Sequence, residues 1–155
     1  NKDALATKRR LKKKENNERL KKYCRHKRKT DPAYKLRSLI SCSINNYLKK
    51  NNSSKNKQSC LKYLDYSIKE LREHLEKQFE PWMNWNNHGR YNLLSWNEND
   101  SSTWTWQIDH IIPQSVLVYY SMEEDNFKKC WALNNLRPYS SKLNLTDGVT
   151  RSRHR

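Results

Sequence analysis

The sequence predicts an α+β fold in which a mainly helical N-terminal part is followed by a small strand–strand–helix unit. Apolar side chains at three- and four-residue spacing recur among helix-forming residues in the first half of the chain. From about Pro81 onward the composition changes to Trp, Asn and turn residues, and two short β-forming stretches follow. A length of 155 residues suggests one domain with an appendage. Because only 34% of the residues are hydrophobic, the packed core must be small.

The formal net charge of +16 is concentrated at the start of the chain. Residues 1–29 contain 14 Lys and Arg against 3 Asp and Glu, which accounts for +11 of the total. An excess of this size points to a polyanion as partner, and the resemblance described below implies that it is DNA. The segment has good helix formers and almost no apolar stripe, so we expect a helical arm that follows the DNA backbone. The alternative is a solvated charged helix. The arm residues expected to contact DNA are Lys8, Arg9, Arg10, Lys12, Lys13, Lys14, Arg19, Lys21, Lys22, Arg25, Lys27 and Arg28.

An amphipathic helix is predicted directly after the arm. Asp31 and Pro32 form a cap and first-turn pair, and the apolar residues that follow recur at helical spacing. A polar linker over residues 50–58 ends this part of the chain. We therefore expect a basic arm and amphipathic helix over residues 1–58 and a second domain over residues 59–155.

The second domain begins with another helix and continues into a region rich in tryptophan. Ser67 and Glu70 form a capping box at the start of this helix. Five tryptophans then fall between residues 82 and 106. Aromatic side chains among Asn and basic residues can stack on nucleic-acid bases. Core packing is the favoured interpretation for any one of them, because a chain with few aliphatic residues needs Trp to fill its core.

Several classes of protein are disfavoured by the composition. The 4 cysteines are widely separated and form no Cys-x-x-Cys pair, so we expect unpaired thiols and no zinc. The 2 glycines are too few for a phosphate-cradling loop, and neither nucleotide-binding fingerprint is present. No apolar run approaches the roughly 20 residues that span a bilayer, and no signal segment opens the chain. We expect an intracellular protein, in the cytoplasm or nucleus wherever its DNA lies, with no membrane partner.

The stretch "TWQIDHIIPQS" places Asp109 and His110 side by side among β-forming residues. Adjacent residues of a regular strand point to opposite faces. The two side chains can act on one phosphate only if the strand bends or ends there, and Pro113 is consistent with pairing that stops close by. We therefore predict that the strand ends near His110.

A second strand and a short helix are predicted next. The strand carries Asn135 and runs through about Pro138. The helix opens at residues 140–141, where serine is a preferred cap, and stops at Gly148, a usual terminator. Asn144 lies on this helix, nine residues after Asn135.

The residues "IDHIIPQS", followed by "NLRPYSSKLN", resemble the HNH nuclease signature. In that signature an Asp-His strand is followed by an Asn and, nine residues later, by an Asn or His on a helix. "DHIIPQS" is similar to the HNH domain of RNA-guided CRISPR nucleases. "YLDYSIKELREHLEKQF", "MNWNNHG" and "WQIDHIIP" resemble HNH endonucleases of mobile elements and large DNA viruses. The resemblance covers about residues 60–148, with its catalytic unit at 104–148, and this chain departs from it in His88 and in an insertion over 91–105.

The resemblance implies a metal-dependent DNA endonuclease of the ββα-metal class, of the homing or mobile-element type. A neutral imidazole can take a proton from water, so His110 is the expected general base. Asp109 and the Asn144 amide supply hard oxygen ligands suited to one Mg²⁺ or Mn²⁺. In the family, the Asn at the position of Asn135 braces the bend and orients the His by hydrogen bonding. Asn134 is the alternative for that role.

Other charged residues near the motif have two interpretations each. Arg137 and Lys142 are expected to contact DNA phosphates, although a residue of this kind taken alone is more often a solvated side chain. Asp147, one helical turn after Asn144, is a reserve metal ligand. His88 is interpreted as structural or DNA-facing.

Two other functions are compatible with the same residues. One is a module that binds DNA or RNA through an inactive nuclease core. The other is a subunit of a larger complex that cuts only when it is delivered to DNA. One active site cuts one strand, so double-strand cleavage would need a homodimer or two successive nicks.

Overall fold

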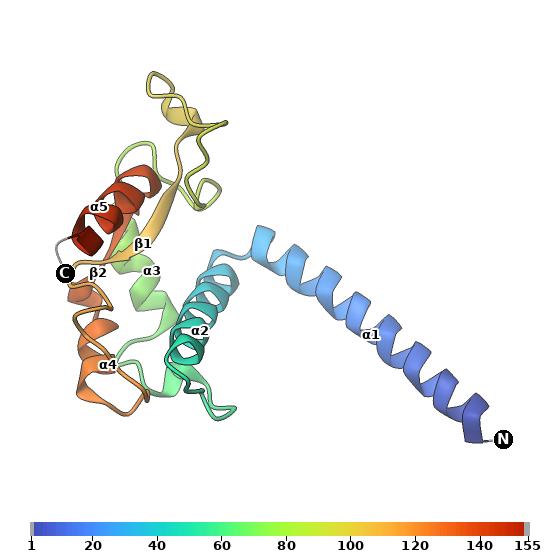
Figure 1. Cartoon of the computed structure of the whole chain (residues 1–155). Helices are drawn as coiled ribbons and strands as arrows, with labels where there is room; N and C mark the ends of the chain where they lie inside the picture. Colours follow the sequence, from blue (N-terminus) through green and yellow to red (C-terminus); the bar gives the residue numbers. More distant parts are fainter. Residues whose placement is uncertain (1, 154–155) are drawn as a thin grey trace.

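The computed structural model describes the backbone of residues 2–153 and the side chains of residues 2–148. The helices are α1 (Lys2–Thr30), α2 (Pro32–Lys50), α3 (Ile68–Glu76), α4 (Asp125–Cys130) and α5 (Ser141–Arg153), and the strands are β1 (Trp106–His110) and β2 (Leu136–Ser140). Short 3₁₀ turns lie at Cys60–Lys62, Ser101–Thr103 and Leu133–Asn135. A helical N-terminal part thus precedes a two-stranded antiparallel sheet and a last helix, which confirms the α+β fold (Figure 1).

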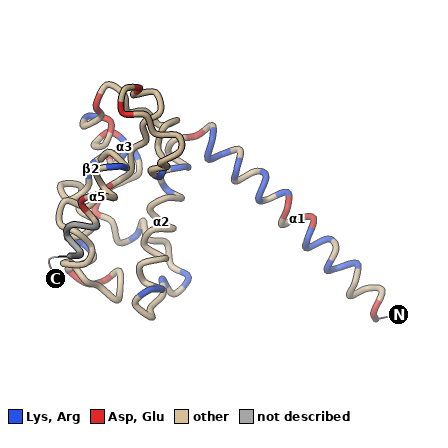
Figure 2. Tube along the Cα trace, turned by 45° about the horizontal axis from the view of Figure 1, so that its top comes forward, with Lys and Arg blue, Asp and Glu red and all other residues tan. Residues whose placement is uncertain are grey.

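Helix α1 extends away from the rest of the molecule (Figure 1) and has no buried residue. Lys and Arg recur along its whole length (Figure 2). Its C-terminal end meets α2, where the Tyr34 hydroxyl donates to Cys24 Sγ at 3.3 Å. Since α1 contributes nothing to the core, its charged surface is fully available to a partner.

Helix α2 begins as the cap pair predicts. The Asp31 carboxylate accepts a hydrogen bond from the Tyr34 backbone N–H at 3.0 Å, and Pro32 occupies the first helical position. Its buried stripe consists of Leu36, Ile40, Ile44 and Leu48. These side chains share one hydrophobic core with α3, α4 and the start of β2, so the polar segment that follows α2 joins two parts of a single core.

Helix α3 connects that core to the sheet. Its predicted capping box is present: Glu70 N–H donates to Ser67 Oγ at 3.2 Å, and Ser67 N–H donates to the Glu70 carboxylate at 2.7 Å. The buried side chains of α3 are Leu71 and Leu75. On the same helix, His74 Nε2 donates to the Leu136 carbonyl oxygen at 2.9 Å. His74 therefore holds the first residue of β2.

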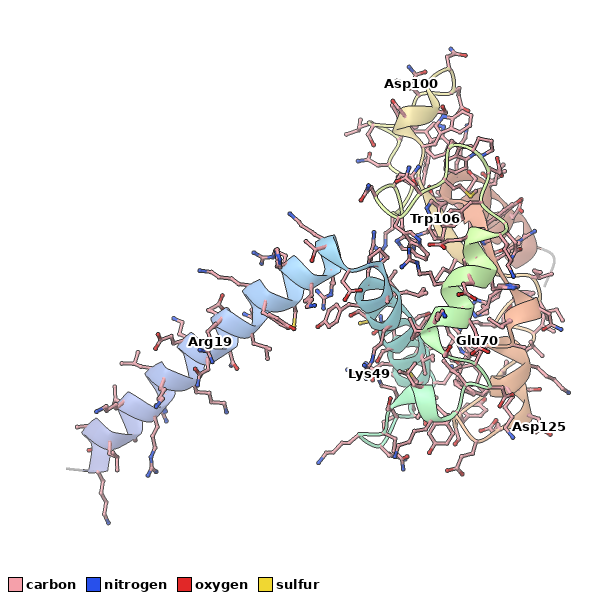
Figure 3. All side chains as sticks on the ribbon, turned by 180° about the vertical axis from the view of Figure 1, so that it is seen from behind. Arg19, Lys49, Glu70, Asp100, Trp106 and Asp125 are labelled. Atoms are coloured by element: carbon pink, nitrogen blue, oxygen red, sulfur yellow. The ribbon has the colours of Figure 1, made fainter. Side chains whose placement is uncertain are left out.

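Trp106, at the start of β1, is a central core residue (Figure 3). Its ring contacts Phe79, Trp85 and His88 with centroid distances of 4.8, 5.3 and 4.8 Å. Its indole N–H donates to the Asn84 carbonyl oxygen at 2.7 Å. Core packing is thus the observed role of Trp106, and it fixes the segment before β1 against the strand.

The insertion before β1 forms a projection beside the sheet (Figure 1). Trp104 packs against Trp82 and stacks on Trp96, with centroid distances of 5.5 and 5.7 Å. An ion pair between Glu98 and Lys142 ties the projection to α5. These tryptophans are half-buried and support one another rather than the main core.

The sheet and α5 form the predicted strand–strand–helix unit, with three differences in detail. Asn135 is not on the second strand but ends the 3₁₀ turn before it, and β2 continues to Ser140 instead of ending near Pro138. Helix α5 also does not stop at Gly148 but runs to Arg153. A terminating glycine needs a positive φ, and Gly148 does not have one, so the helix passes through it.

Two further properties concern the chain's thiols and its helices. All four cysteines are free, and Cys60 and Cys130 are buried, as expected for unpaired thiols partly in the core. Within the described residues, no helix is both long enough and apolar enough to cross a bilayer.

Candidate functional site

Strand β1 ends at His110, and Asn135 forms hydrogen bonds with the two residues that follow it. Ile111 N–H donates to the Asn135 carbonyl oxygen at 2.9 Å. The Asn135 side chain accepts from Ile112 N–H at 2.7 Å and donates to the Ile112 and Cys130 carbonyl oxygens at 3.2 and 2.8 Å. Asn135 is only 5% exposed. It therefore braces the backbone directly after His110, and no hydrogen bond from it to the His110 ring is found.

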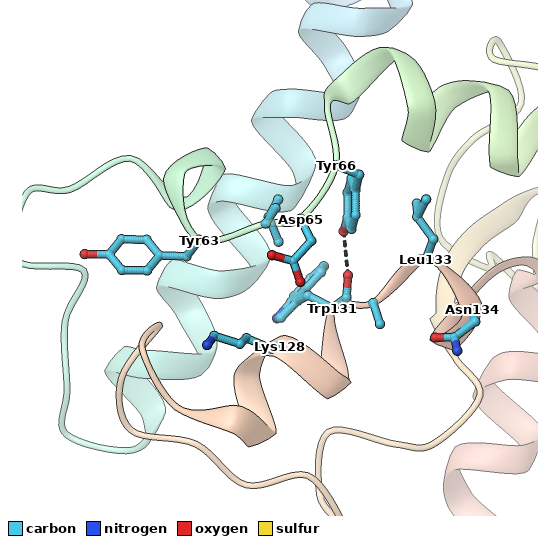
Figure 4. Close-up of a pocket in the computed structure, with 9 residues that line it drawn as sticks. Tyr63, Asp65, Tyr66, Lys128, Trp131, Leu133 and Asn134 are labelled. Atoms are coloured by element: carbon cyan, nitrogen blue, oxygen red, sulfur yellow. Dashed lines mark hydrogen bonds between the residues drawn. The ribbon is translucent and has the colours of Figure 1, made fainter.

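Asn134, the alternative for this role, points elsewhere. It is exposed and lines a separate cavity of about 300 Å³ beside Trp131 and Tyr66 (Figure 4). In that cavity the Tyr66 hydroxyl donates to the Trp131 carbonyl oxygen at 2.7 Å. The bracing contacts to the end of β1 thus come from Asn135.

Asp109 is buried and paired with a cation across the sheet. It lies opposite Arg137, whose Nε donates to Asp109 Oδ2 at 3.0 Å and whose Nη2 lies 2.9 Å from the same oxygen in an ion pair. No described residue hydrogen-bonds to Asp109 Oδ1. Arg137 in turn lies over the Tyr139 ring, 4.0 Å from its centroid, in a cation–π contact. The structure therefore places Arg137 on a protein carboxylate, and contact with a DNA phosphate stays a prediction.

Asn144 reaches the same face of the sheet from α5. Its Nδ2 atom donates to Gln107 Oε1 at 3.3 Å. Gln107 and Asp109 are two residues apart on β1, so their side chains share one face. The Asn144 amide oxygen has no hydrogen-bond partner among the described residues. One carboxylate oxygen and one amide oxygen are thus left without protein donors on this face.

These two oxygens fit the chemistry of a magnesium site with few protein ligands. Mg²⁺ prefers oxygen ligands and keeps several waters when one or two protein groups bind it. No group of three or more His, Cys, Asp or Glu side chains that could enclose a metal occurs among residues 2–148. An ion held by Asp109 and Asn144 would have its remaining positions filled by water and phosphate oxygens.

His110 is packed rather than solvated. Its ring meets Trp131 edge to face at a centroid distance of 4.7 Å, and its Nε2 atom is buried without a partner among the described residues. Burial lowers the pKa of His110 to about 4, although the negative charge of Asp109 acts in the opposite direction. The ring is therefore uncharged at neutral pH, which is the form that a general base needs.

His110 also lines a groove of about 580 Å³ between α2, β1 and the segment of His88 to Arg90. Lys35, His88 and Arg90 are among the other residues that line it. Lys35 Nζ donates to the Trp85 carbonyl oxygen at 2.8 Å, and burial lowers its pKa. Basic side chains therefore line the groove beside His110, and an anionic strand of nucleic acid could enter this groove.

The remaining predicted DNA contacts are not part of this site. The twelve arm residues all lie on α1, which extends away from the sheet (Figure 1). Lys142 is on α5, but it pairs with Glu98 of the insertion. Asp147, the reserve ligand, accepts a hydrogen bond from the Tyr139 hydroxyl at 2.9 Å.

Sequence reasoning missed four residues around the site. Gln107 could have been found, because strand alternation places it on the face of Asp109. Tyr139 could have been found in the same way from its position two residues after Arg137. Lys35 and Trp131 carried no local signal, since their places depend on how α2 and α4 pack against β1.

Comparison with known proteins gives one distant relative. No protein-family model matches the chain. The chain is similar to an uncharacterized protein, L426, of Acanthamoeba polyphaga mimivirus, with 28% identity over 109 residues. The match covers 70% of this chain and 40% of the relative, so the chain spans about two fifths of that protein's length. No solved structure matches.

Proposed function

We propose that this chain is a metal-dependent DNA endonuclease of the HNH class, with one Mg²⁺ or Mn²⁺ in each active site. The observation that carries the proposal is the end of β1. There Asp109 and His110 are adjacent, Asn135 braces the backbone that follows, and α5 brings Asn144 to the face of Asp109. These are residue types that phosphodiester hydrolysis needs, and because strand alternation turns His110 to the face opposite Asp109, the substrate would have to reach both faces at the end of β1.

Each residue has a distinct task in the proposed reaction. Hydrolysis needs an activated water, a cation near the developing charge and help for the leaving oxygen. Asp109 and Asn144 would hold the metal, which would supply the charge stabilisation. His110 Nε2 is buried without a partner among the described residues, so it would accept the proton of a water molecule only once substrate has opened its surroundings. Because the low pKa makes this imidazole a weak base, substrate or metal must change its surroundings to raise its basicity.

The arm would supply affinity rather than chemistry. A duplex or single strand is attracted to clustered Lys and Arg side chains whatever its sequence. The exposed charge of α1 is therefore suited to hold DNA while the sheet and α5 act on one phosphate. The role of a homing or mobile-element nuclease belongs to the same proposal and rests on the sequence resemblance.

Plasmid nicking tests the proposal. The full chain, incubated with supercoiled plasmid, should produce nicked circles with Mg²⁺ or Mn²⁺ and none with EDTA. Asp109→Asn and Asn144→Ala should each lower the rate at least about 100-fold, while Asn134→Ala should retain it.

Binding without cleavage under every metal condition would contradict the nuclease and favour the rival binding module. Cleavage that appears only when partner proteins are added would favour the subunit of a larger complex. Cleavage that persists in EDTA would contradict the metal-dependent mechanism.

A further inference from the structure

The strongest feature outside the proposed reaction is a chain of contacts that begins at Asp109 and ends on α5. Two nitrogen atoms of Arg137, Nε and Nη2, contact Asp109 Oδ2, and the guanidinium lies over the Tyr139 ring. The Tyr139 hydroxyl then donates to Asp147 Oδ2 at 2.9 Å. Three elements are linked in this way: β1 through Asp109, β2 through Arg137 and Tyr139, and α5 through Asp147.

A second link closes the chain of contacts into a ring. Asn144 and Asp147 are three residues apart on α5, so they lie on the same side of that helix. Asn144 Nδ2 donates to Gln107 Oε1, which returns the path to β1 two residues before Asp109. The ring therefore joins β1 and α5 twice, directly through Gln107 and Asn144 and indirectly through Arg137 and Tyr139 of β2.

We propose that Arg137 and Tyr139 are positioning residues that hold the two metal ligands, Asp109 on the sheet and Asn144 on the helix, at the separation the metal needs. This inference rests on the proposed function. Arg137 would fix the carboxylate through Oδ2 so that Oδ1 is presented to the metal. Tyr139 would fix Arg137 and, through Asp147, the turn of α5 that carries Asn144.

The geometry favours positioning over two simpler roles. A charge-assisted hydrogen bond such as that from Arg137 Nε to Asp109 Oδ2 is stronger than a neutral one, so it restrains the carboxylate. An arginine that only contacted DNA would not need to be held both by Asp109 and by the Tyr139 ring. Asp147 acts through the Tyr139 hydroxyl here, which gives it a role other than direct metal ligation. Outer partners of this kind commonly determine metal affinity.

Direct metal binding gives the decisive test, because it does not depend on cleavage. Mn²⁺ binding to the full chain is measured by the loss of the free-ion EPR signal. Tyr139→Phe removes only the hydroxyl donor and should weaken Mn²⁺ binding about threefold to tenfold, the effect of one hydrogen bond. Tyr63→Phe is the matched control, because the Tyr63 hydroxyl donates to Gln58 Oε1 at 2.8 Å, outside the ring, and Mn²⁺ binding should be unchanged.

Two further substitutions separate geometry from charge. Arg137→Lys keeps the charge but loses the planar fork and the stacking, so it should weaken binding about tenfold. Asp147→Asn keeps an acceptor for the Tyr139 hydroxyl and should retain most of the affinity. Amide exchange over residues 141–148 should become faster in Tyr139→Phe and in Arg137→Lys, but not in Tyr63→Phe.

The outcomes distinguish this inference from the function on which it rests. Wild-type Mn²⁺ binding that Asp109→Asn abolishes but Tyr139→Phe and Arg137→Lys leave unchanged would overturn the positioning roles alone. Tighter binding in Arg137→Lys would also overturn them, because it would make Arg137 a competitor of the metal. A loss in Asp147→Asn as large as that in Asp109→Asn would make Asp147 a ligand and overturn its place in the ring. Failure of the wild-type chain to bind Mn²⁺ would overturn the metal site itself, and the inference with it.

Discussion

The Asn135 side chain forms hydrogen bonds with both the backbone N–H and the backbone carbonyl oxygen of Ile112, two residues after His110. These two hydrogen bonds replace the backbone hydrogen bonds of a longer strand, because they satisfy backbone polar groups at the point where β1 ends. The backbone directly after β1 is therefore hydrogen-bonded, as it is within the strand. The His110 imidazole, which we propose as the general base, lies directly before this segment and packs against the Trp131 ring.

Removal of the Asn135 side chain should destabilise the protein. Asn135→Ala removes both contacts to Ile112 and leaves the buried Cys130 carbonyl oxygen without its donor, so the free energy of unfolding should fall by about 1–3 kcal/mol. Asn134→Ala removes an exposed amide of the same size and should change it by less than about 0.5 kcal/mol. Urea denaturation of both variants measures the difference. Equal stabilities would show that Asn135 does not brace the strand end.

Stability should decrease in mild acid because of His88. Burial lowers the pKa of His88 to about 4, and the charge of Lys35 acts in the same direction. Between this pKa and the usual value of 6.5 the unfolded chain binds a proton that the folded chain does not. The free energy of unfolding should therefore fall as the pH decreases from about 6.5 to about 4, by on the order of 2 kcal/mol.

His88→Gln isolates that contribution. The free energy of unfolding of this variant, measured by denaturation at pH 7 and at pH 4.5, should differ less between the two pH values than that of the wild type. His110 has a pKa lowered in the same direction, so a residual decrease should remain in the variant. A pH dependence identical to that of the wild type would show that His88 is not buried in its neutral form.

Deletion of residues 2–29 should weaken DNA binding without unfolding the remaining protein. Helix α1 has no buried residue, so the thermal midpoint of the shortened chain should stay close to that of the full chain. If six arm cations contact phosphates, the slope of log K against log salt should decrease in magnitude by about 5. Fluorescence anisotropy with labelled duplex over a salt series measures this slope. An unchanged slope would favour the solvated charged helix over the DNA-binding arm.

Local patterns in the sequence were enough to predict several elements. The starts of α2 and α3 follow from Asp31 with Pro32 and from Ser67 with Glu70, because caps are contacts within one helical turn. The end of β1 near His110 followed from strand alternation and the nearby Pro113. These signals need no knowledge of the rest of the fold.

Other features depend on contacts between distant segments and could not be predicted. The 3₁₀ position of Asn135 comes from its bonds to Ile112, and the pairing of Arg137 with Asp109 comes from the sheet register. Gly148 was expected to end a helix, but glycine ends a helix only where the chain turns into positive φ. The groove beside His110 is lined by residues of α2, of β1 and of the segment before β1, so no single segment shows it.

We propose His110 as the general base of DNA cleavage. Single-turnover plasmid nicking by His110→Ala at saturating Mg²⁺ tests this role most directly. General-base catalysis contributes about 10²- to 10⁴-fold, so the rate constant should fall by at least that lower factor while DNA affinity, measured in EDTA, stays equal to that of the wild type. Cleavage at the wild-type rate by His110→Ala, at matched Mg²⁺ concentration and matched DNA occupancy, would contradict the account.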